Sequence, residues 1–341
     1  MAAWFAVPMA SAQTPDWGVE VSKGYALPHR AEMLALVTGH SHGVGIRRGN
    51  WDRAGWRANW SQHGPVWQGF ELGWLDGGSD ELGSVASALW LIKIPIRTNW
   101  HAELGTGIGW ASAPYDPINR PLSIAIGTRW NAGLHLGTSV TIASGDRAFL
   151  ALGAGLTHFS NGALALPNLG INNVHIRMRG GLLNDSRSQE VAHAHSTPQH
   201  RWTYALAVRS GMRDVNLPGG PRHPVLSAGA YAQRHISGAF AWTGALDLAH
   251  NQSLRAYHLQ PLNPREKLQL SSLLGVNLHF GNAHLMLLQG WVWTRPDEAL
   301  GRRHLQAVFA YAFGTQWAIE AGLRSFRLRA DYPFIGLRFS L

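Results

Sequence analysis

Apolar and polar residues alternate with a period of two along most of the chain. In residues 99–110, Trp100 and Ile108 belong to an apolar row that alternates with polar residues and glycines, and residues 131–142 and 268–280 repeat the pattern. Strict alternation of this length is typical of a β-strand with two different faces. Each segment also approaches the roughly 9–11 residues that a tilted strand needs to cross a bilayer.

The number of these segments indicates the fold. One apolar row and one row of small, polar or charged residues suit a strand with lipid outside and a polar lumen inside, and roughly 14 to 16 such strands predict an antiparallel outer-membrane β-barrel. A soluble β-sandwich also alternates, but its strands are shorter and fewer. The candidate strands lie near residues 17–26, 36–47, 64–74, 86–96, 99–110, 123–142 (long enough for two), 146–160, 173–183, 201–213, 223–234, 239–249, 268–280, 283–293, 303–313, 316–326 and 332–341.

The connections between these segments alternate in length. Residues 97–98 and 281–282 form short turns, whereas residues 161–172 are one of several long loops. Outer-membrane barrels have short periplasmic turns and long outer loops, so counting back from the C-terminal strand places 161–172 at the outer end. Residues 49–63 and 184–200 do not fit, because they are long yet fall on the inner side; 184–200 could join two sub-regions of one barrel.

The ends of the chain suggest export to the outer membrane of a Gram-negative bacterium. Residues 1–12 are apolar and finish in Ala10-Ser11-Ala12, a pattern typical of signal-peptide cleavage, although no positive segment precedes it. Residues 13–341 are then expected to form a single barrel. Residues 334–341 resemble the terminal signal that the barrel assembly machinery reads, a glycine followed by alternating hydrophobic residues.

Composition narrows the possible functions. Hydrophobic residues make up 45% and charged residues 14%, but no apolar run approaches the roughly 20 residues of a membrane-spanning helix. The absence of cysteine excludes disulfides, thiolate metal sites and a cysteine nucleophile. The net charge of +9 could favour anionic lipid or a phosphorylated glycolipid, while the scattered arginines do not suggest a nucleic-acid module. The pairs His40/His42 and His193/His195 lack an evident third ligand, so no metal is expected.

A Ser–His pair lies at the end of one predicted strand. His158 and Ser160 are two positions apart and therefore share a face, which is the aliphatic, lipid-facing row of residues 148–160. Asn172 has the parity of the apolar row of the next strand. These three polar side chains are expected to converge at the lipid-facing outer rim. Ser–His pairs perform acyl transfer, so an ester of an outer-leaflet lipid is a plausible substrate.

The same stretch resembles a known catalytic motif. His158, Ser160 and Asn161 followed by Pro167-Asn168 and Gly170 have the form H-x-S-N and P-N-x-G of the lipid A 3-O-deacylase (PagL) and acyloxyacyl hydrolase-like barrels. The resemblance implies an outer-membrane esterase that removes an acyl chain from the lipid A part of lipopolysaccharide without a cofactor. It covers about residues 85–185, the deacylase-like catalytic region, whereas residues 201–341 are an extension expected to complete the barrel.

The resemblance also implies roles for individual residues. His158 corresponds to the base, Ser160 to the nucleophile and Asn161 to an asparagine that helps hold the oxyanion. Asn172 stands where the single-domain deacylases have a glutamate that orients the histidine. A neutral asparagine can hold an imidazole tautomer but cannot stabilise imidazolium as a carboxylate does.

A non-catalytic porin, transporter or structural barrel is the alternative. Arg177, Arg179 and Arg209 have lumen-facing parity and are expected to be solvated lumen charges, with an anion-selective pore as the lesser alternative. Arg47, with its neighbours Arg48, Arg53 and Arg57, is a candidate contact for lipid phosphates. An open, charged lumen would favour transport, and a filled lumen would favour the enzyme.

Overall fold

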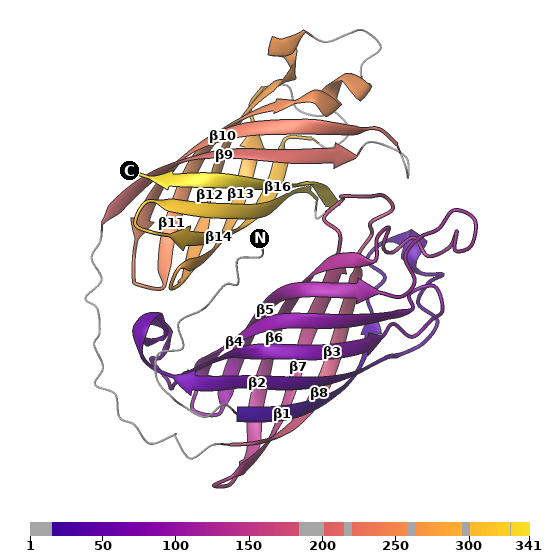
Figure 1. The fold of residues 1–341 in the computed structure, drawn as a ribbon, viewed down its shortest axis with the longest axis vertical. Helices are drawn as coiled ribbons and strands as arrows, with labels where there is room; N and C mark the ends of the chain where they lie inside the picture. Colours follow the sequence, from indigo (N-terminus) through magenta and orange to yellow (C-terminus); the bar gives the residue numbers. More distant parts are fainter. Residues whose placement is uncertain (1–15, 184–200, 215–219, 258–262, 295–300, 328) are drawn as a thin grey trace, which may run out of the picture.

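The computed structural model describes residues 16–183, 201–214, 220–257, 263–294, 301–327 and 329–341, which form an all-β antiparallel fold. These described ranges contain sixteen strands, the upper end of the predicted 14 to 16, and the strands close into two eight-stranded barrels (Figure 1). The first barrel comprises β1 (Asp16–Ala26), β2 (Ser41–Asp52), β3 (Val66–Asp76), β4 (Ser84–Arg97), β5 (Trp100–Ala111), β6 (Trp130–Ser144), β7 (Ala148–Ser160) and β8 (Ile171–Leu182).

The second barrel follows with eight further strands. They are β9 (Trp202–Asp214), β10 (Arg222–His235), β11 (Phe240–Asn251), β12 (Leu268–Phe280), β13 (Ala283–Val292), β14 (Arg303–Phe313), β15 (Trp317–Phe326) and β16 (Arg329–Ser340). The expectation of a single barrel over 13–341 is wrong, because β1 pairs with β8 and β16 pairs with β9. Residues 201–341 therefore do not complete the first barrel. The proposed signal peptide and the connection 184–200 lie outside the described residues.

Two strand boundaries differ from those expected. The segment near 36–47 becomes β2 only from Ser41, because residues 34–36 form a turn after the short 3-10 helix η1 (Ala31–Met33) and residues 37–40 are irregular. Residues 123–142 hold one strand rather than two, since Ala125 and Ile126 are buried in the loop that precedes β6. Other short helices are η2 (Gly55–Trp60), η4 (Gln252–Tyr257) and η5 (Pro264–Lys267). Within the described ranges, no helix is long and apolar enough to cross a membrane.

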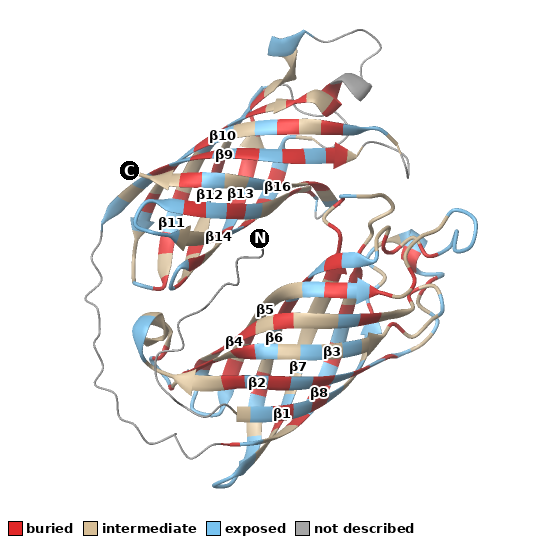
Figure 2. Ribbon diagram, in the orientation of Figure 1, coloured by how far each residue is buried: buried red, intermediate tan, exposed pale blue. Residues whose placement is uncertain are grey.

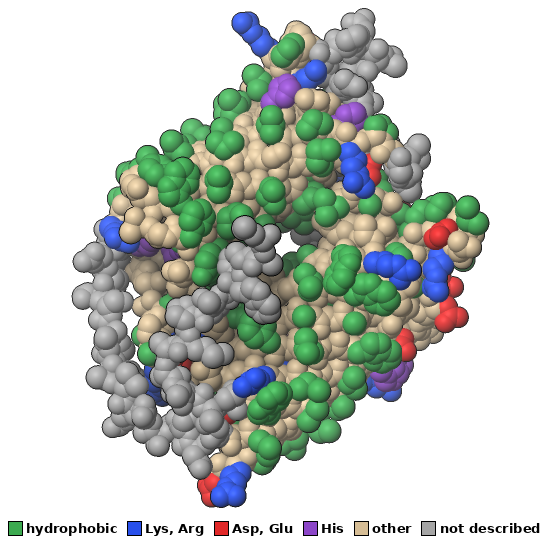
Figure 3. Space-filling view, viewed as in Figure 1, with side chains coloured by type: hydrophobic (Ala, Val, Ile, Leu, Met, Phe, Trp, Pro, Cys, Tyr) green, Lys and Arg blue, Asp and Glu red, His purple; other side chains and the backbone are tan. Residues whose placement is uncertain are grey.

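Each strand presents one face outward and one into its lumen. In β2, Val44 and Ile46 are exposed, whereas Ser41 and Arg47 are buried inside the barrel. Figure 2 shows the resulting alternation of exposed and buried positions along the strands of both barrels. Hydrophobic side chains are accordingly spread over both barrels on the face that Figure 3 shows. The two faces thus have the chemistry that lipid outside and polar groups inside require.

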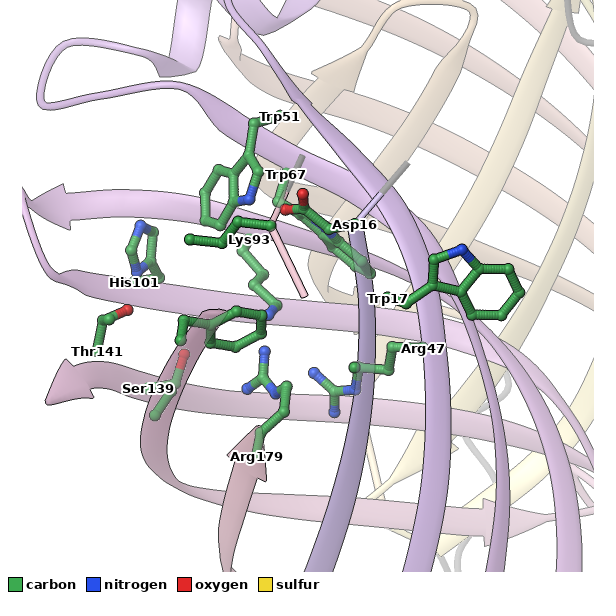
Figure 4. Close-up of a pocket in the computed structure, with 14 residues that line it drawn as sticks. Asp16, Trp17, Arg47, Trp51, Trp67, Lys93, His101, Ser139, Thr141 and Arg179 are labelled. Carbon is green, nitrogen blue, oxygen red and sulfur yellow. The ribbon is translucent and has the colours of Figure 1, made fainter. Parts of the chain in front are cut away.

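Ion pairs fill the lumen of the first barrel. The fully buried Glu103 of β5 accepts hydrogen bonds from Arg47 at 3.1 Å, Arg177 at 2.7 Å and Arg179 at 3.0 Å. Glu20 adds a second carboxylate 2.9 Å from Arg47. Figure 4 shows Arg47 and Arg179 directed into the same interior region. Arg177 and Arg179 are therefore buried and paired rather than solvated, and Arg47 is a lumen residue rather than part of a lipid-binding loop.

The second lumen is filled in the same way. Arg209 forms ion pairs with Asp247 at 3.0 Å and Glu320 at 2.9 Å, so it too is paired rather than solvated. Two cavities in the described first lumen hold only about 30 and about 50 Å³, room for one or two water molecules each. An eight-stranded barrel is just wide enough for its own side chains, so the filled lumens favour the enzyme over a pore.

The two barrels touch at both ends. We call the end with the loops 27–40, 112–129 and 161–170 the loop end, and the other the turn end. At the turn end, Trp60 of η2 donates a hydrogen bond to the carbonyl oxygen of His279 at 2.9 Å and stacks on Phe280. The connection within 49–63 is long although it falls on the predicted periplasmic side, because it carries a helix that packs on the second barrel.

Candidate active site

Strand pairing brings the predicted site residues together at the loop end. His158 near the end of β7 lies directly opposite Asn172 near the start of β8. One His158 ring nitrogen, Nδ1, lies 2.7 Å from Asn172 Oδ1, and the other, Nε2, lies 2.9 Å from Ser160 Oγ. The three side chains form one hydrogen-bonded series on the outward face of the first barrel.

The partners determine which ring nitrogen carries the proton. Because a carbonyl oxygen can only accept, His158 Nδ1–H must donate to Asn172 Oδ1, which leaves Nε2 free to accept from the Ser160 hydroxyl. This tautomer is the one that a general base for Ser160 needs.

A residue that sequence reasoning missed extends the series. With its Oδ1 facing His158, Asn172 places Nδ2 2.8 Å from Nδ1 of His29, which also lies 3.3 Å from the Leu27 carbonyl oxygen. His29 follows β1, and the Leu27 backbone N–H donates to the Asn172 carbonyl at 2.7 Å. The closure of β1 onto β8 therefore delivers His29, a signal available only once the barrel is known to have eight strands.

Asn161 shapes the loop that follows Ser160. Its backbone N–H donates to Asn168 Oδ1 at 3.1 Å, and its Nδ2 donates to the Ala165 carbonyl at 2.9 Å. Its Oδ1 accepts from the Ala163 backbone N–H at 2.9 Å. These contacts direct Asn161 into loop 161–170, so its part in holding an oxyanion stays a prediction.

Gly170 has a steric reason to be glycine. Its φ of +81° lies in the left-handed region, and an added Cβ would lie 2.7 Å from Cε1 of His158. Any side chain there would displace the imidazole. Two residues of the P-N-x-G segment, Asn168 and Gly170, thus support the Ser–His pair without belonging to it.

The site opens into a cavity of about 310 Å³ between the barrels. His158, Ser160 and Leu166 line it from the first barrel, and Leu323 and Arg329 line it from the second. Sequence parity predicts an outward face here, but part of that face is covered by the second barrel rather than by lipid. Ser160 is accordingly buried.

The family comparison covers this site. A family model described as Lipid A 3-O-deacylase (PagL) matches residues 41–179, from the start of β2 into β8. Over these residues the first barrel is similar to that family. The match starts earlier than the region 85–185 expected from the motif, and it includes His158, Ser160, Asn161 and Asn172. His29 and the whole second barrel lie outside the PagL match.

Other comparisons add little. No curated protein matches the chain. Among solved structures, a triple mutant of the Rhodopseudomonas blastica porin is 11% identical, with 96% of this chain and 99% of that chain covered and a TM-score of 0.22. Another engineered variant of that porin is 10% identical over the same shares, with a TM-score of 0.21. TM-scores this low support no conclusion about either barrel of this chain.

Among the described residues, no group of three or more histidine, aspartate or glutamate side chains is arranged to hold a metal ion. His193 and His195 lie outside it.

Proposed function

We propose that the protein is an outer-membrane serine esterase that removes an ester-linked acyl chain from lipid A of lipopolysaccharide. The observation that carries the proposal is the series Asn172–His158–Ser160, joined at 2.7 and 2.9 Å on the outward face of a PagL-like barrel. A site on the outside of a barrel can reach an ester of an outer-leaflet lipid without extracting the lipid.

In the proposed mechanism, Ser160 carries out the first chemical step. Its Oγ attacks the ester carbonyl carbon while His158 Nε2 accepts the hydroxyl proton. The carbonyl oxygen becomes an oxyanion, which we assign to donors at the start of loop 161–170, with Asn161 as the predicted contributor.

Collapse of this intermediate breaks the ester bond. The departing sugar hydroxyl oxygen takes the proton from His158 Nε2, and the acyl chain stays on Ser160. A water molecule then attacks the acyl-enzyme, with His158 again accepting the proton, and the fatty acid leaves as Ser160 regains its own. Atoms and protons balance with water as the only co-reactant.

The outward apolar rows support a location in an outer membrane. We propose that this is the outer membrane of a Gram-negative bacterium and that the barrel assembly machinery inserts the protein there. The loop end, which holds Ser160, would then face the outer leaflet, where lipopolysaccharide resides.

Mass spectrometry of lipid A tests the proposal. Cells that express the protein should lose one acyl chain from lipid A, and cells that express Ser160→Ala at the same level of folded barrel should not. Asn282→Asp, an exposed substitution at the turn end, serves as the matched control and should behave as wild type. Unchanged lipid A with the wild-type protein would refute lipid A deacylation.

Replacement of Asn172 should separate orientation from charge. Asn172→Ala removes the acceptor of His158 Nδ1–H and should lower kcat by roughly 10- to 100-fold. Asn172→Asp keeps an acceptor and adds a charge that stabilises imidazolium, so kcat should exceed that of the wild type by about tenfold. Steady-state hydrolysis by purified protein in detergent measures both effects.

The same Asn282→Asp variant controls for added negative charge. If Asn172→Asp proved slower than the wild type while its barrel remained folded, the neutral amide and its bond to His29 would be the arrangement that the enzyme requires.

A further inference from the structure

The hairpin of β15 and β16 forms the far wall of the cleft in front of Ser160. Leu323 and Ser325 lie on the outward face of β15, and both line the cavity. Pro333 and Leu323 lie 3.5 and 3.6 Å from the point that a Cβ on Gly162 would occupy, so only about one methyl group would fit between them and this glycine. The second barrel therefore lies close to the loop that follows Ser160, and the two line the same cavity.

Two arginines border this cavity from opposite barrels. Arg30 comes from the β1–β2 connection and Arg329 from the start of β16. No ion pair or hydrogen bond joins either side chain to another residue of the described chain, and no acidic residue lines the cavity. The lumen arginines Arg47, Arg177 and Arg209, by contrast, each have a carboxylate partner.

The rest of the lining is largely apolar. Leu166, Leu169 and Leu323 supply aliphatic surface beside the Ser–His pair. Two unpaired guanidinium groups and an aliphatic wall together fit an anionic amphiphile, because arginine binds phosphate through paired N–H donors while acyl chains pack on leucine. A neutral glyceride would leave both arginines without a partner.

We propose that the second barrel completes the substrate site, and that Arg30 and Arg329 bind a phosphate group of the acylated lipid so that its ester lies at Ser160. This inference rests on the proposed function and adds how the enzyme would recognise its lipid substrate. It gives the second barrel a role that a PagL-like barrel alone lacks. The phosphate is that of the lipid headgroup, not free phosphate.

Binding measurements can test this independently of catalysis. Full-length Ser160→Ala protein in neutral detergent micelles would be titrated with bisphosphorylated lipid A and with the same lipid after removal of its phosphates. We expect tighter binding of the phosphorylated lipid, and Arg329→Gln in this background should reduce that preference by about tenfold. Arg327→Gln is the matched control, because Arg327 is exposed on the same hairpin but does not line the cavity.

Equal affinity for the two lipids, or an equal loss of preference in Arg327→Gln, would overturn the proposal. So would inorganic phosphate that binds as tightly as the lipid, because the site would then be a simple anion site. Heat-dependent gel migration would show that each variant is folded. Selective binding without hydrolysis by the wild type would refute the esterase alone, whereas hydrolysis without selectivity would refute only the phosphate site.

Discussion

Ser160→Ala, His158→Ala and the double variant are expected to lose acyl-ester hydrolysis to the same extent, by roughly 10⁴-fold or more in kcat. The reason is that Ser160 and His158 act as one unit. Without His158 the hydroxyl proton has no acceptor at 2.9 Å, and without Ser160 the imidazole has no nucleophile to activate. Once either Ser160 or His158 is replaced, replacing the other should lower kcat hardly any further.

Purified variants in detergent micelles with a phosphorylated lipid substrate would give these rates. In the wild type, kcat should fall as the pH is lowered, because protonation of His158 Nε2 removes the base. His158→Ala should lack this acidic limb. Losses that multiply in the double variant, or an acidic limb that persists without His158, would show that another group activates the nucleophile.

Local pattern was enough to predict the strands and the faces they present. Period-two alternation predicts 16 strands at its upper limit, and parity places His158, Ser160 and Asn172 on one outward face, where the structure shows them hydrogen-bonded. Their roles in catalysis remain a proposal. The prediction that these side chains lie together succeeds because consecutive antiparallel strands joined by a loop pair with each other. His158 and Asn172 are therefore neighbours once β7 and β8 are recognised.

Closure of the sheet could not be predicted in the same way. Alternation is identical in one barrel of sixteen strands and in two of eight, and only the pairs β1–β8 and β9–β16 distinguish them. Three features depend on that closure: the delivery of His29 to Asn172, the approach of Arg329 to the cleft, and the burial of the lumen arginines. Each is a contact between segments far apart in sequence, which single-sequence periodicity does not encode.

Glu103→Gln is expected to destabilise the first barrel by about 3–5 kcal/mol. The side chain is fully buried and accepts hydrogen bonds from Arg47, Arg177 and Arg179 at 2.7 to 3.1 Å. Glutamine has nearly the same volume, so the change removes charge without opening a cavity. Three guanidinium groups would then share only the carboxylates of Glu20 and Glu71, and unpaired buried charge is costly.

Urea unfolding in lipid vesicles, followed by the fluorescence of the 16 tryptophans, measures the effect. Asp146→Asn makes the same charge change in the exposed turn between β6 and β7, and should alter stability by less than about 0.5 kcal/mol. A loss below about 1 kcal/mol in Glu103→Gln would mean that water enters the lumen and solvates the arginines. The filled-lumen argument against a pore would then fail, because it depends on these ion pairs excluding solvent.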